Sequence, residues 1–362
     1  MNIFKQSRID KYIIKKFLGT YIFAISLIIA VSVMFDFNEK VDFFIKNSAP
    51  TKAIIFDYYL NFIPYYANLF SALFTFIAVI VFTSKLAENS EIIAILSNGV
   101  SFRRLMRPYM ISAGIIAIFT FLLNSFVIPP ANVTRIEFQN TYVRNKKVDY
   151  GSNIQLEVSP GVIAYFDRYD AKTQRGVRFS LDKFEDKKLV SRLTAHSITY
   201  DSAYHWTIND YTIRDFIGMK EEVRTGTNID TTLAIIPSDF LISVNDCEQM
   251  TTFELKKYID RQKKRGIGNI QQFEIEFHNR FAMTFTAFIL TIIGASLSAR
   301  KIKGGMGFNI GIGLLLSFSY IFFMQVASSF AISGAVSPFV AVWIPNLSYS
   351  IIAFYLYKRA PN

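Results

Sequence analysis

Two groups of three long apolar segments, separated by a polar stretch, set the strongest limit on the fold of this chain. The segments are rich in Phe, Ile, Leu and Ala and contain no Lys, Arg, Asp or Glu. A helix needs about 20 apolar residues to cross the hydrocarbon core of a bilayer, where every backbone polar group must be paired internally. We therefore predict six membrane spans in a 3 + 3 arrangement: Phe17–Phe35, Leu60–Thr83, Pro108–Ile128, Phe281–Ala299, Gly307–Phe330 and Pro338–Tyr357.

The apolar segments fit a soluble protein or a signal peptide less well than membrane spans. A buried helix of a large soluble protein explains one such segment but not six. The first segment also has the character of a cleaved signal peptide, but it is long and no small-residue cleavage site follows it. A retained membrane anchor is therefore favoured.

The positive charges predict the orientation. The chain has a net charge of +11, while residues 131–279 hold equal numbers of basic and acidic side chains. The excess lies in the N-terminal segment, the second and fourth connections between spans, and the C-terminal tail. The positive-inside rule then places both termini in the cytoplasm and the polar stretch outside. Because the charge is spread over short juxtamembrane segments, we do not expect nucleic-acid binding.

The polar stretch has the alternating pattern of β-strands. Cys247 is the only cysteine, so packing rather than a disulfide must stabilise this part. Residues 250–266 return to a helical pattern and lead back to the membrane. The segments predicted as antiparallel strands of a sandwich or open jelly roll are Val162–Tyr169, Val177–Glu185, Leu189–Tyr200 and Tyr204–Phe216.

These elements predict an α+β membrane protein with an inserted antiparallel β domain. Residues 1–134 would form the first membrane half, with a coupling helix near residues 88–99. Residues 135–245 would form the β domain, and residues 246–362 the connecting helix and the second membrane half.

The chain lacks the sequence motifs of common nucleotide-binding proteins and hydrolases. It has no P-loop, no Gly-x-Ser-x-Gly and no His-Glu-x-x-His, and His196, His205 and His278 are scattered without ligand-like spacing. The predicted spans lack ionisable residues that could relay protons or pair with a coupling ion, which disfavours an ion-driven carrier and an intramembrane aspartyl protease. We therefore predict no metal site, no cofactor and no enzymatic activity, and expect a partner to supply energy.

Residues 85–108, between the second and third spans, offer a place for that partner. Glu91 stands at the start of a predicted short helix, Ser90 is placed to cap it, and Gly99 ends it. The apolar strip of this helix consists of Ile92, Ile93, Ile95 and Leu96. Such a helix suits a groove in a cytoplasmic protein, and the alternative is a helix that rests on lipid headgroups.

Four segments resemble the lipopolysaccharide-export permeases of the LptF/LptG (YjgP/YjgQ) family. They follow in order over essentially the whole chain around the 3 + 3 layout. The segments are DKYIIKKFLGTYIF with FDFNEKVDFF, SEIIAILSNGVSFRRLMRP, LVSRLTAHSITYD with HWTINDYTIRDF, and FELKKYIDRQKKRG with FEIEFHNRFAMTFTAFILTIIGASLSAR.

The resemblance implies a permease subunit of an ABC transporter in the inner membrane, with a periplasmic β jelly roll. The implied partners are a paralogous permease subunit, a dimer of a cytoplasmic ABC ATPase, periplasmic jelly-roll bridge proteins and lipopolysaccharide. Glu91 matches the acidic position of the family's coupling helix. The residues expected to couple to the ATPase are Glu91, Ile92, Ile95, Leu96, Gly99 and Arg103.

Substrate contacts follow from the anionic character of lipid A. Basic side chains near the outer ends of spans one and three, namely Lys40, Lys46 and Arg135, are candidates for headgroup contacts, and ordinary snorkelling at the interface is the alternative. Inward-facing strand residues Ile163 and Ile198 are candidates for the lipid path.

Two features bear on the gate and the cargo. Spans one and five would form the lateral gate by analogy, and Gly307, Gly311 and Gly313 permit close helix approach or serve ordinary packing. Unlike many family members, this chain has acidic neighbours around Lys40, which weakens the expectation of headgroup contacts there and is compatible with a different glycolipid: Asp36, Glu39 and Asp42.

Two further functions stay open for this sequence. One is an ABC permease for another lipid or lipoprotein, and the other is a membrane scaffold whose β domain only binds proteins. The sequence does not separate an F-like from a G-like role.

Overall fold

The computed structural model describes residues 8–143, 150–171, 173–237, 244–264, 270–300 and 305–360. The chain divides into two compact units. The helical unit comprises Met1–Val143, Glu248–Thr252 and Gln271–Asn362. The second unit comprises Arg144–Cys247 and Phe253–Ile270 and contains the sheet and α7 (Thr252–Lys264), whose first residue falls in the helical unit.

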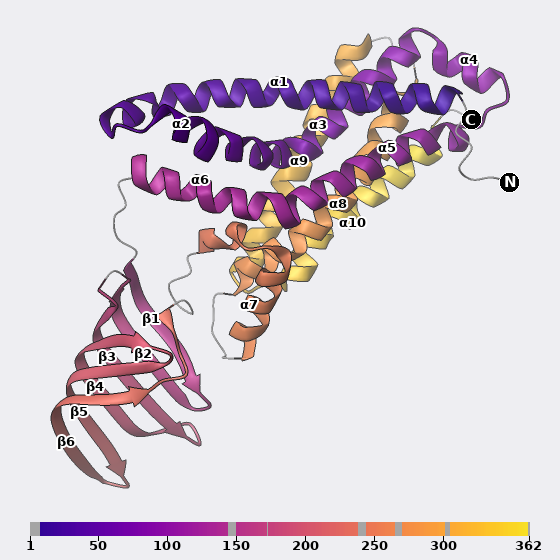
Figure 1. Ribbon diagram of the computed structural model, residues 1–362. Helices are drawn as coiled ribbons and strands as arrows, with labels where there is room; N and C mark the ends of the chain where they lie inside the picture. The colour runs from indigo at the N-terminus through magenta and orange to yellow at the C-terminus, as the bar shows by residue number, and fades with distance from the viewer. Residues whose placement is uncertain are drawn as a thin grey trace. The chain divides into compact units, whose positions relative to one another are not determined.

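Within the described residues, the helical unit has six helices that are long and apolar enough to cross a membrane. This confirms the predicted 3 + 3 layout. They are α1 (Arg8–Lys46), α3 (Leu60–Glu88), α5 (Phe102–Leu122), α8 (Gln271–Ser298), α9 (Gly305–Ile332) and α10 (Pro338–Lys358) (Figure 1).

Two of these helices are extended by neighbouring helical segments. The short α2 (Thr51–Ala53) and the π-helical η1 (Ile54–Tyr59) run into α3, and the π-helical η2 (Leu123–Val127) joins α5 to α6 (Ile128–Tyr142). The 39 residues of α1 correspond to about 58 Å of helix, well beyond a hydrocarbon core of about 30 Å. The helical unit therefore reaches past the bilayer.

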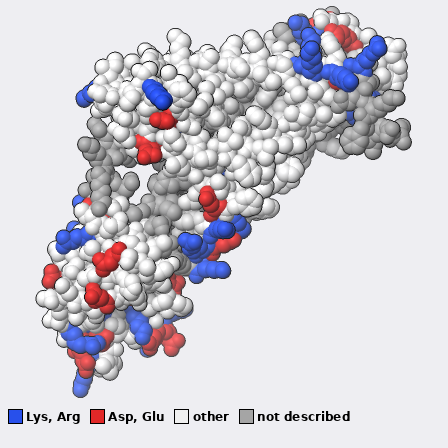
Figure 2. Space-filling model, in the orientation of Figure 1, with Lys and Arg blue, Asp and Glu red and all other residues white. Residues whose placement is uncertain are grey.

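The surface of the helical unit has the charge distribution expected of such helices. Figure 2 shows a broad stretch free of Lys, Arg, Asp and Glu along the long helices, with charged side chains at the ends. An uncharged band of this kind suits the hydrocarbon core, where ionised side chains are costly.

Two helices form the centre of the unit. Helix α8 packs against α3, α5 and α10, and α3 also packs against α1 and α9. In each of the two spans that contain α3 and α8, 56% of the most apolar stretch is buried within the protein. The corresponding share is 17% for α1 and 22% for α9. Helices α1 and α9 therefore present large apolar faces that the described part of the chain leaves uncovered.

Gly307, Gly311 and Gly313 of α9 differ in their surroundings. A Cβ on Gly313 would lie 2.1 Å from Cδ1 of Ile80 in α3, whereas Gly307 and Gly311 face open space. Close approach between α9 and α3 thus explains Gly313 alone.

The start of α1 and the last turns of α10 lie at the same end of the helical unit. Tyr12 near the start of α1 contacts Glu91 in α4 (Glu91–Ser97), and the ring of Phe102 in α5 contacts that of Tyr357 in α10, with centroids 5.8 Å apart. We call this the α4 end, visible in Figure 1 where α4 lies beside the start of α1. Helices α3 and α8 begin at the opposite end.

The second unit contains a six-stranded antiparallel sheet in the sequence order β1-β2-β3-β4-β5-β6. The predicted antiparallel strands are confirmed, and β1 and β6 are additional. The strands are β1 (Tyr150–Ser159), β2 (Val162–Asp170), β3 (Arg175–Glu185), β4 (Lys188–Ser202), β5 (His205–Ile217) and β6 (Lys220–Thr232). A jelly-roll arrangement stays a prediction, because the described strands form one sheet in chain order.

One face of the sheet carries an aromatic and aliphatic core. Phe166, Phe179 and Ala195 lie side by side on β2, β3 and β4, and the fully buried Trp206 packs on Phe166 with ring centroids 6.0 Å apart. The indole Nε1 of Trp206 donates a hydrogen bond to the carbonyl oxygen of Ile235, 3.0 Å away. Trp206 thus ties the segment after β6 to the sheet.

Substitution of Trp206 tests this contact between the sheet and the segment after β6. Trp206→Phe should lower the free energy of unfolding by about 1 to 2 kcal/mol, because it removes the indole hydrogen bond and part of the buried ring. Thermal unfolding of the purified chain followed by circular dichroism measures the change. Trp343→Phe is the matched control, since Trp343 is half-buried among rings of the helical unit. An equal effect of both variants would contradict the assigned role of Trp206.

Candidate functional site

The α4 segment forms a tight corner between α3 and α5. Gly99 has a φ of 80°, and its N–H donates to the carbonyl oxygen of Leu96, as expected for a glycine that ends a helix. The prediction that Ser90 caps α4 is wrong. Ser90 has a φ of 61° and makes no side-chain capping bond, because a capping side chain requires an extended backbone. Ser101 caps α5 instead, with its Oγ accepting the N–H of Arg104 at 3.3 Å.

The apolar side chains of α4 face two different directions. Ile92 is 1% exposed and belongs to the core formed with α1, α3 and α5, and Ile95 and Leu96 pack partly against the same core. Ile93 is 53% exposed. The chain therefore anchors α4 to its own helices and leaves Ile93 as the apolar side chain most free to contact another protein.

Glu91 is held between α3 and α1. Its Oε2 accepts a hydrogen bond from the hydroxyl of Tyr12 at 3.2 Å, and its Oε1 accepts one from Nδ2 of Asn89 at 3.3 Å. Both hydrogen bonds are long and therefore weak, and Glu91 stays half-exposed. A carboxylate in this position can bind a cationic group of a partner while remaining linked to α1.

An ion pair fixes α1 to α5 beside this corner. Both terminal nitrogens of Arg104 donate to the carboxylate of Asp10, at 2.8 and 2.6 Å, and Asp10 is only 6% exposed. A two-pronged guanidinium–carboxylate contact fixes direction as well as distance. The first turn of α1 and the first turn of α5 therefore move together.

Arg104→Gln tests this linkage. The variant should lose about 1.5 to 3 kcal/mol of stability, because the nearly buried carboxylate of Asp10 keeps its charge without its guanidinium partner. Thermal unfolding in detergent measures the loss. The exposed Arg8 in the same first turn of α1 provides the control, and Arg8→Gln should change stability little. If both variants have the melting temperature of the parent, the ion pair does not hold the two helices together.

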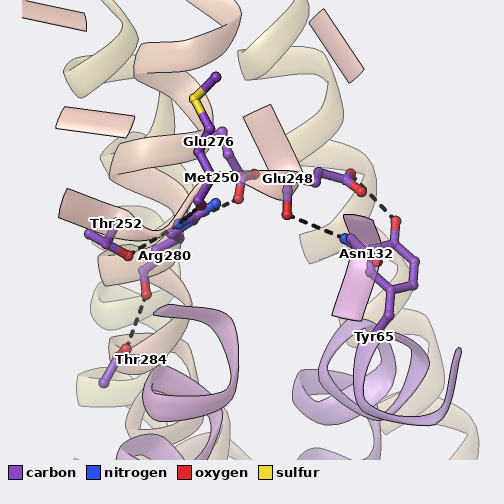
Figure 3. Close-up of polar contacts among 8 residues, drawn as sticks. All are labelled: Tyr65, Asn132, Glu248, Met250, Thr252, Glu276, Arg280 and Thr284. Atoms are coloured by element: carbon purple, nitrogen blue, oxygen red, sulfur yellow. Dashed lines mark hydrogen bonds and ion pairs between the residues drawn. The ribbon is translucent and has the colours of Figure 1, made fainter. Parts of the chain in front are cut away.

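A buried polar cluster lies at the opposite end of the helical unit (Figure 3). Arg280 in α8 is 1% exposed, and its Nε donates to Oε1 of Glu276 at 2.9 Å. Its Nη1 donates to the carbonyl oxygen of Met250 at 2.9 Å and to Oγ1 of Thr252 at 3.1 Å. Arg280 therefore holds the segment that returns to the membrane helices directly on α8.

The same returning segment is held on its other side. Glu248 lies in the 3₁₀ turn η4 (Val244–Gln249), and its Oε1 accepts from the hydroxyl of Tyr65 at 3.4 Å. Its carbonyl oxygen accepts from Nδ2 of Asn132 in α6 at 3.4 Å. Burial raises the pKa of Glu248, and the positive charge of Arg135 partly opposes this. Residues 248–252 are thus clasped between α3, α6 and α8.

Two of the three headgroup candidates have partners inside the helical unit. Arg135 is 7% exposed, lies 4.3 Å from the ring centroid of Tyr65, and donates from Nε to Asn132 at 3.2 Å. Lys40 pairs with Asp36 and the hydroxyl of Tyr58. Lys46 is exposed in the last turn of α1. The acidic residue Asp36 therefore serves an internal pair, and headgroup contact stays a prediction for all three basic side chains.

The two lipid-path candidates lie on different faces of the sheet. Ile198 is fully buried in the core. The prediction that Ile163 faces inward is wrong. Ile163 pairs across from Asp182, which pairs with Arg192 on the next strand, so it lies in a charged row, whereas its neighbour Ala164 faces the core.

An apolar pocket of about 720 Å³ opens between the second half of α1 and the segment that leads into α3. Its lining reaches Phe44 and Ile45 in the last turn of α1, at the end of the unit opposite α4. Its lining includes Val33, Met34, Phe37, Phe44, Ile54 and Tyr59. A space of this size and composition suits acyl chains.

Sequence reasoning missed the buried ionic groups. The spacing of Glu276 and Arg280, four residues apart just before an apolar run, signals an ion pair on one helix face. The pairing of Asp10 with Arg104 spans 94 positions and has no local signal.

A comparison with protein families gives a match over most of the chain. The sequence model of the family described as "Lipopolysaccharide export system permease LptF/LptG" matches residues 11–359. A search of curated proteins found no match.

Proposed function

This chain belongs to the LptF/LptG family of lipopolysaccharide export system permeases, and from this we propose that it is a membrane subunit of an ABC transporter for lipopolysaccharide. In this role it extracts the glycolipid from the inner membrane and passes it to a periplasmic β bridge that leads toward the outer membrane. The observation that carries the proposal is the match over residues 11–359, which includes all six long helices and the whole sheet between them.

The α4 end is the proposed contact with the ATPase. The positive charges near this end support a cytoplasmic location, with both termini on that side and the sheet in the periplasm. Helix α4 is anchored by Ile92, linked to α1 through Glu91, and adjacent to the ion pair between Asp10 and Arg104. Movement of α4 by a dimer of cytoplasmic ATPases would therefore shift α1 and α5 together.

The uncovered faces of α1 and α9 are the proposed contacts with a paralogous permease subunit. These two helices are the least buried of the long apolar helices in the described chain. Lipid covers such faces in an isolated subunit, and a second subunit across them would enclose a membrane cavity. The apolar pocket between α1 and η1 would lie at the opening of that cavity and receive acyl chains.

The sheet is the proposed periplasmic segment of the route. Its apolar face, with Ile198 and Phe166, would shelter acyl chains, and its edge strands β1 and β6 would pair with bridge proteins by strand addition. The clasp around Arg280 would then pass movement of the membrane helices to the chain that returns from the sheet.

Purification of the chain from its native membrane tests the proposal. We expect an ABC ATPase to co-purify and its ATP hydrolysis to rise when lipopolysaccharide is added to the reconstituted complex. Stimulation of ATP hydrolysis by a different lipid, but not by lipopolysaccharide, would show that the chain transports another cargo. A complex without an ATPase would contradict transport and favour a scaffold.

A further inference from the structure

A second apolar groove opens on the helical unit at the α4 end. Helices α5 and α10 each pack against α8, and the groove of about 800 Å³ lies along these three helices. The rings of Phe102 and Tyr357 meet at its α4 end. The lining residues that carry the argument are Arg103, Arg107, Ile289, Ile292, Phe354 and Tyr357.

Positive charge gathers at one end of this groove. Arg103 and Arg107 lie one helical turn apart on α5, both exposed, and neither makes an ion pair or side-chain hydrogen bond within the part of the chain that the structure describes. Lys358 stands over the ring of Phe354, with its Nζ 4.8 Å from the centroid. The first turn of α5 adds the positive end of a helix dipole. This end of the groove is thus suited to an anion.

The remainder of the groove is suited to a hydrocarbon chain. From Arg103 to Ile111 the lining of α5 spans nine residues, or about 12 Å of helix rise. Along this length Ile289 and Ile292 of α8 and the ring of Phe354 supply apolar surface. Because half of a hydrocarbon core is about 15 Å thick, the groove runs from the headgroup level through most of one leaflet.

We propose that this groove binds an anionic phospholipid of the leaflet at the α4 end, as a resident lipid distinct from the transported cargo. Its phosphate lies between Arg103 and Arg107, and one acyl chain follows Ile292 and Phe354. Arg103 then binds this lipid, in place of the ATPase contact expected from the sequence. Charge complementarity favours this occupant over a transmembrane helix, whose apolar surface would leave both guanidinium groups without a partner. The site lies directly after α4 in the chain, so the lipid would hold the corner on which α4 turns.

Quenching of a tryptophan placed in the groove tests the proposal. Phe354→Trp puts the probe in the lining, and the signal of the parent chain, with its two native tryptophans, is subtracted. The purified full chain is reconstituted in phosphatidylcholine vesicles that contain increasing fractions of brominated phosphatidylglycerol or brominated phosphatidylcholine. We expect half-maximal quenching at a fraction of phosphatidylglycerol about tenfold lower than that of phosphatidylcholine.

Variants that each remove one positive charge show where the preference for the anionic lipid arises. Arg107→Gln in the probe background should bring the two lipids to within about twofold of each other. Lys15→Gln removes an exposed positive charge of α1 outside the groove and should keep the preference. If Phe354→Trp fails to fold, Ile111→Trp places the probe on the opposite wall.

Three outcomes would overturn the proposal. Equal quenching by both lipids in proportion to their fractions shows ordinary bilayer contact. Absence of quenching by either lipid shows that protein fills the groove. Loss of the preference in Lys15→Gln, with retention in Arg107→Gln, places the anionic lipid elsewhere. None of these outcomes depends on lipopolysaccharide or ATP, so the proposed transport role stands or falls separately.

Discussion

Glu91→Ala should reduce ATP-driven lipopolysaccharide transport by about tenfold or more while leaving the melting temperature of the chain nearly unchanged. The carboxylate is half-exposed and makes only two weak hydrogen bonds inside the described chain, so its removal costs little stability. In the proposed complex it binds a cationic group of the ATPase, and a charged contact at an interface contributes more than an exposed internal one. Reconstituted transport and thermal unfolding measure the two quantities.

Three further variants separate the roles of Glu91. Glu91→Gln keeps the size of the side chain and removes its charge, and should be nearly as defective as Glu91→Ala. Tyr12→Phe removes only the hydrogen bond to α1 and should transport nearly normally. Glu137→Ala removes an exposed carboxylate of α6, outside the α4 end, and is the matched control. Normal transport by Glu91→Ala would show that the coupling assignment is wrong.

Arg280→Ala should lower the free energy of unfolding by about 3 to 5 kcal/mol. The guanidinium is 1% exposed and binds Glu276, the carbonyl oxygen of Met250 and the hydroxyl of Thr252. Its removal leaves a charged carboxylate and a backbone carbonyl without a donor in a buried site. Thermal unfolding in detergent measures the loss, and proteolysis near residues 248–252 reports release of the returning segment.

Neutral replacement of the whole pair distinguishes charge from packing. Glu276→Gln combined with Arg280→Met removes both charges and keeps most of the volume, so it should recover at least half of the stability lost in Arg280→Ala. If the double variant is as unstable as Arg280→Ala, loss of the contacts to residues 250 and 252 dominates. A melting temperature of Arg280→Ala within a degree of the parent would show that the cluster does not stabilise the unit.

The membrane spans and the central strands could be predicted because their hydrophobic patterns are local. Each predicted span lies almost entirely within a helix of the structure or its direct continuation. Strand β6 was missed because it is an edge strand with few apolar residues, mainly Val223 and Ile229, and is mostly exposed on both faces. An edge strand has only one hydrogen-bonded neighbour, so its existence depends on β5 rather than on its own pattern.

The failures at the candidate sites have the same origin in tertiary structure. The run around Ile163 is apolar at successive positions, so alternation alone does not show which side chains face the core. Ser90 has the residue type of a cap, but the turn from α3 holds it at positive φ. The burial of Arg135 depends on Tyr65 and Asn132, and Tyr65 belongs to a different helix.

Site-specific photocrosslinking from Ile198 is the most direct test of lipopolysaccharide export by this chain. Ile198 is fully buried on the apolar face of the sheet, and a probe at Ile163 on the charged row provides the matched control. In a reconstituted complex with its ATPase, we predict a lipopolysaccharide adduct at Ile198 that forms only with ATP, and a much weaker adduct at Ile163. An active ATPase with no adduct at Ile198 would contradict export through the sheet.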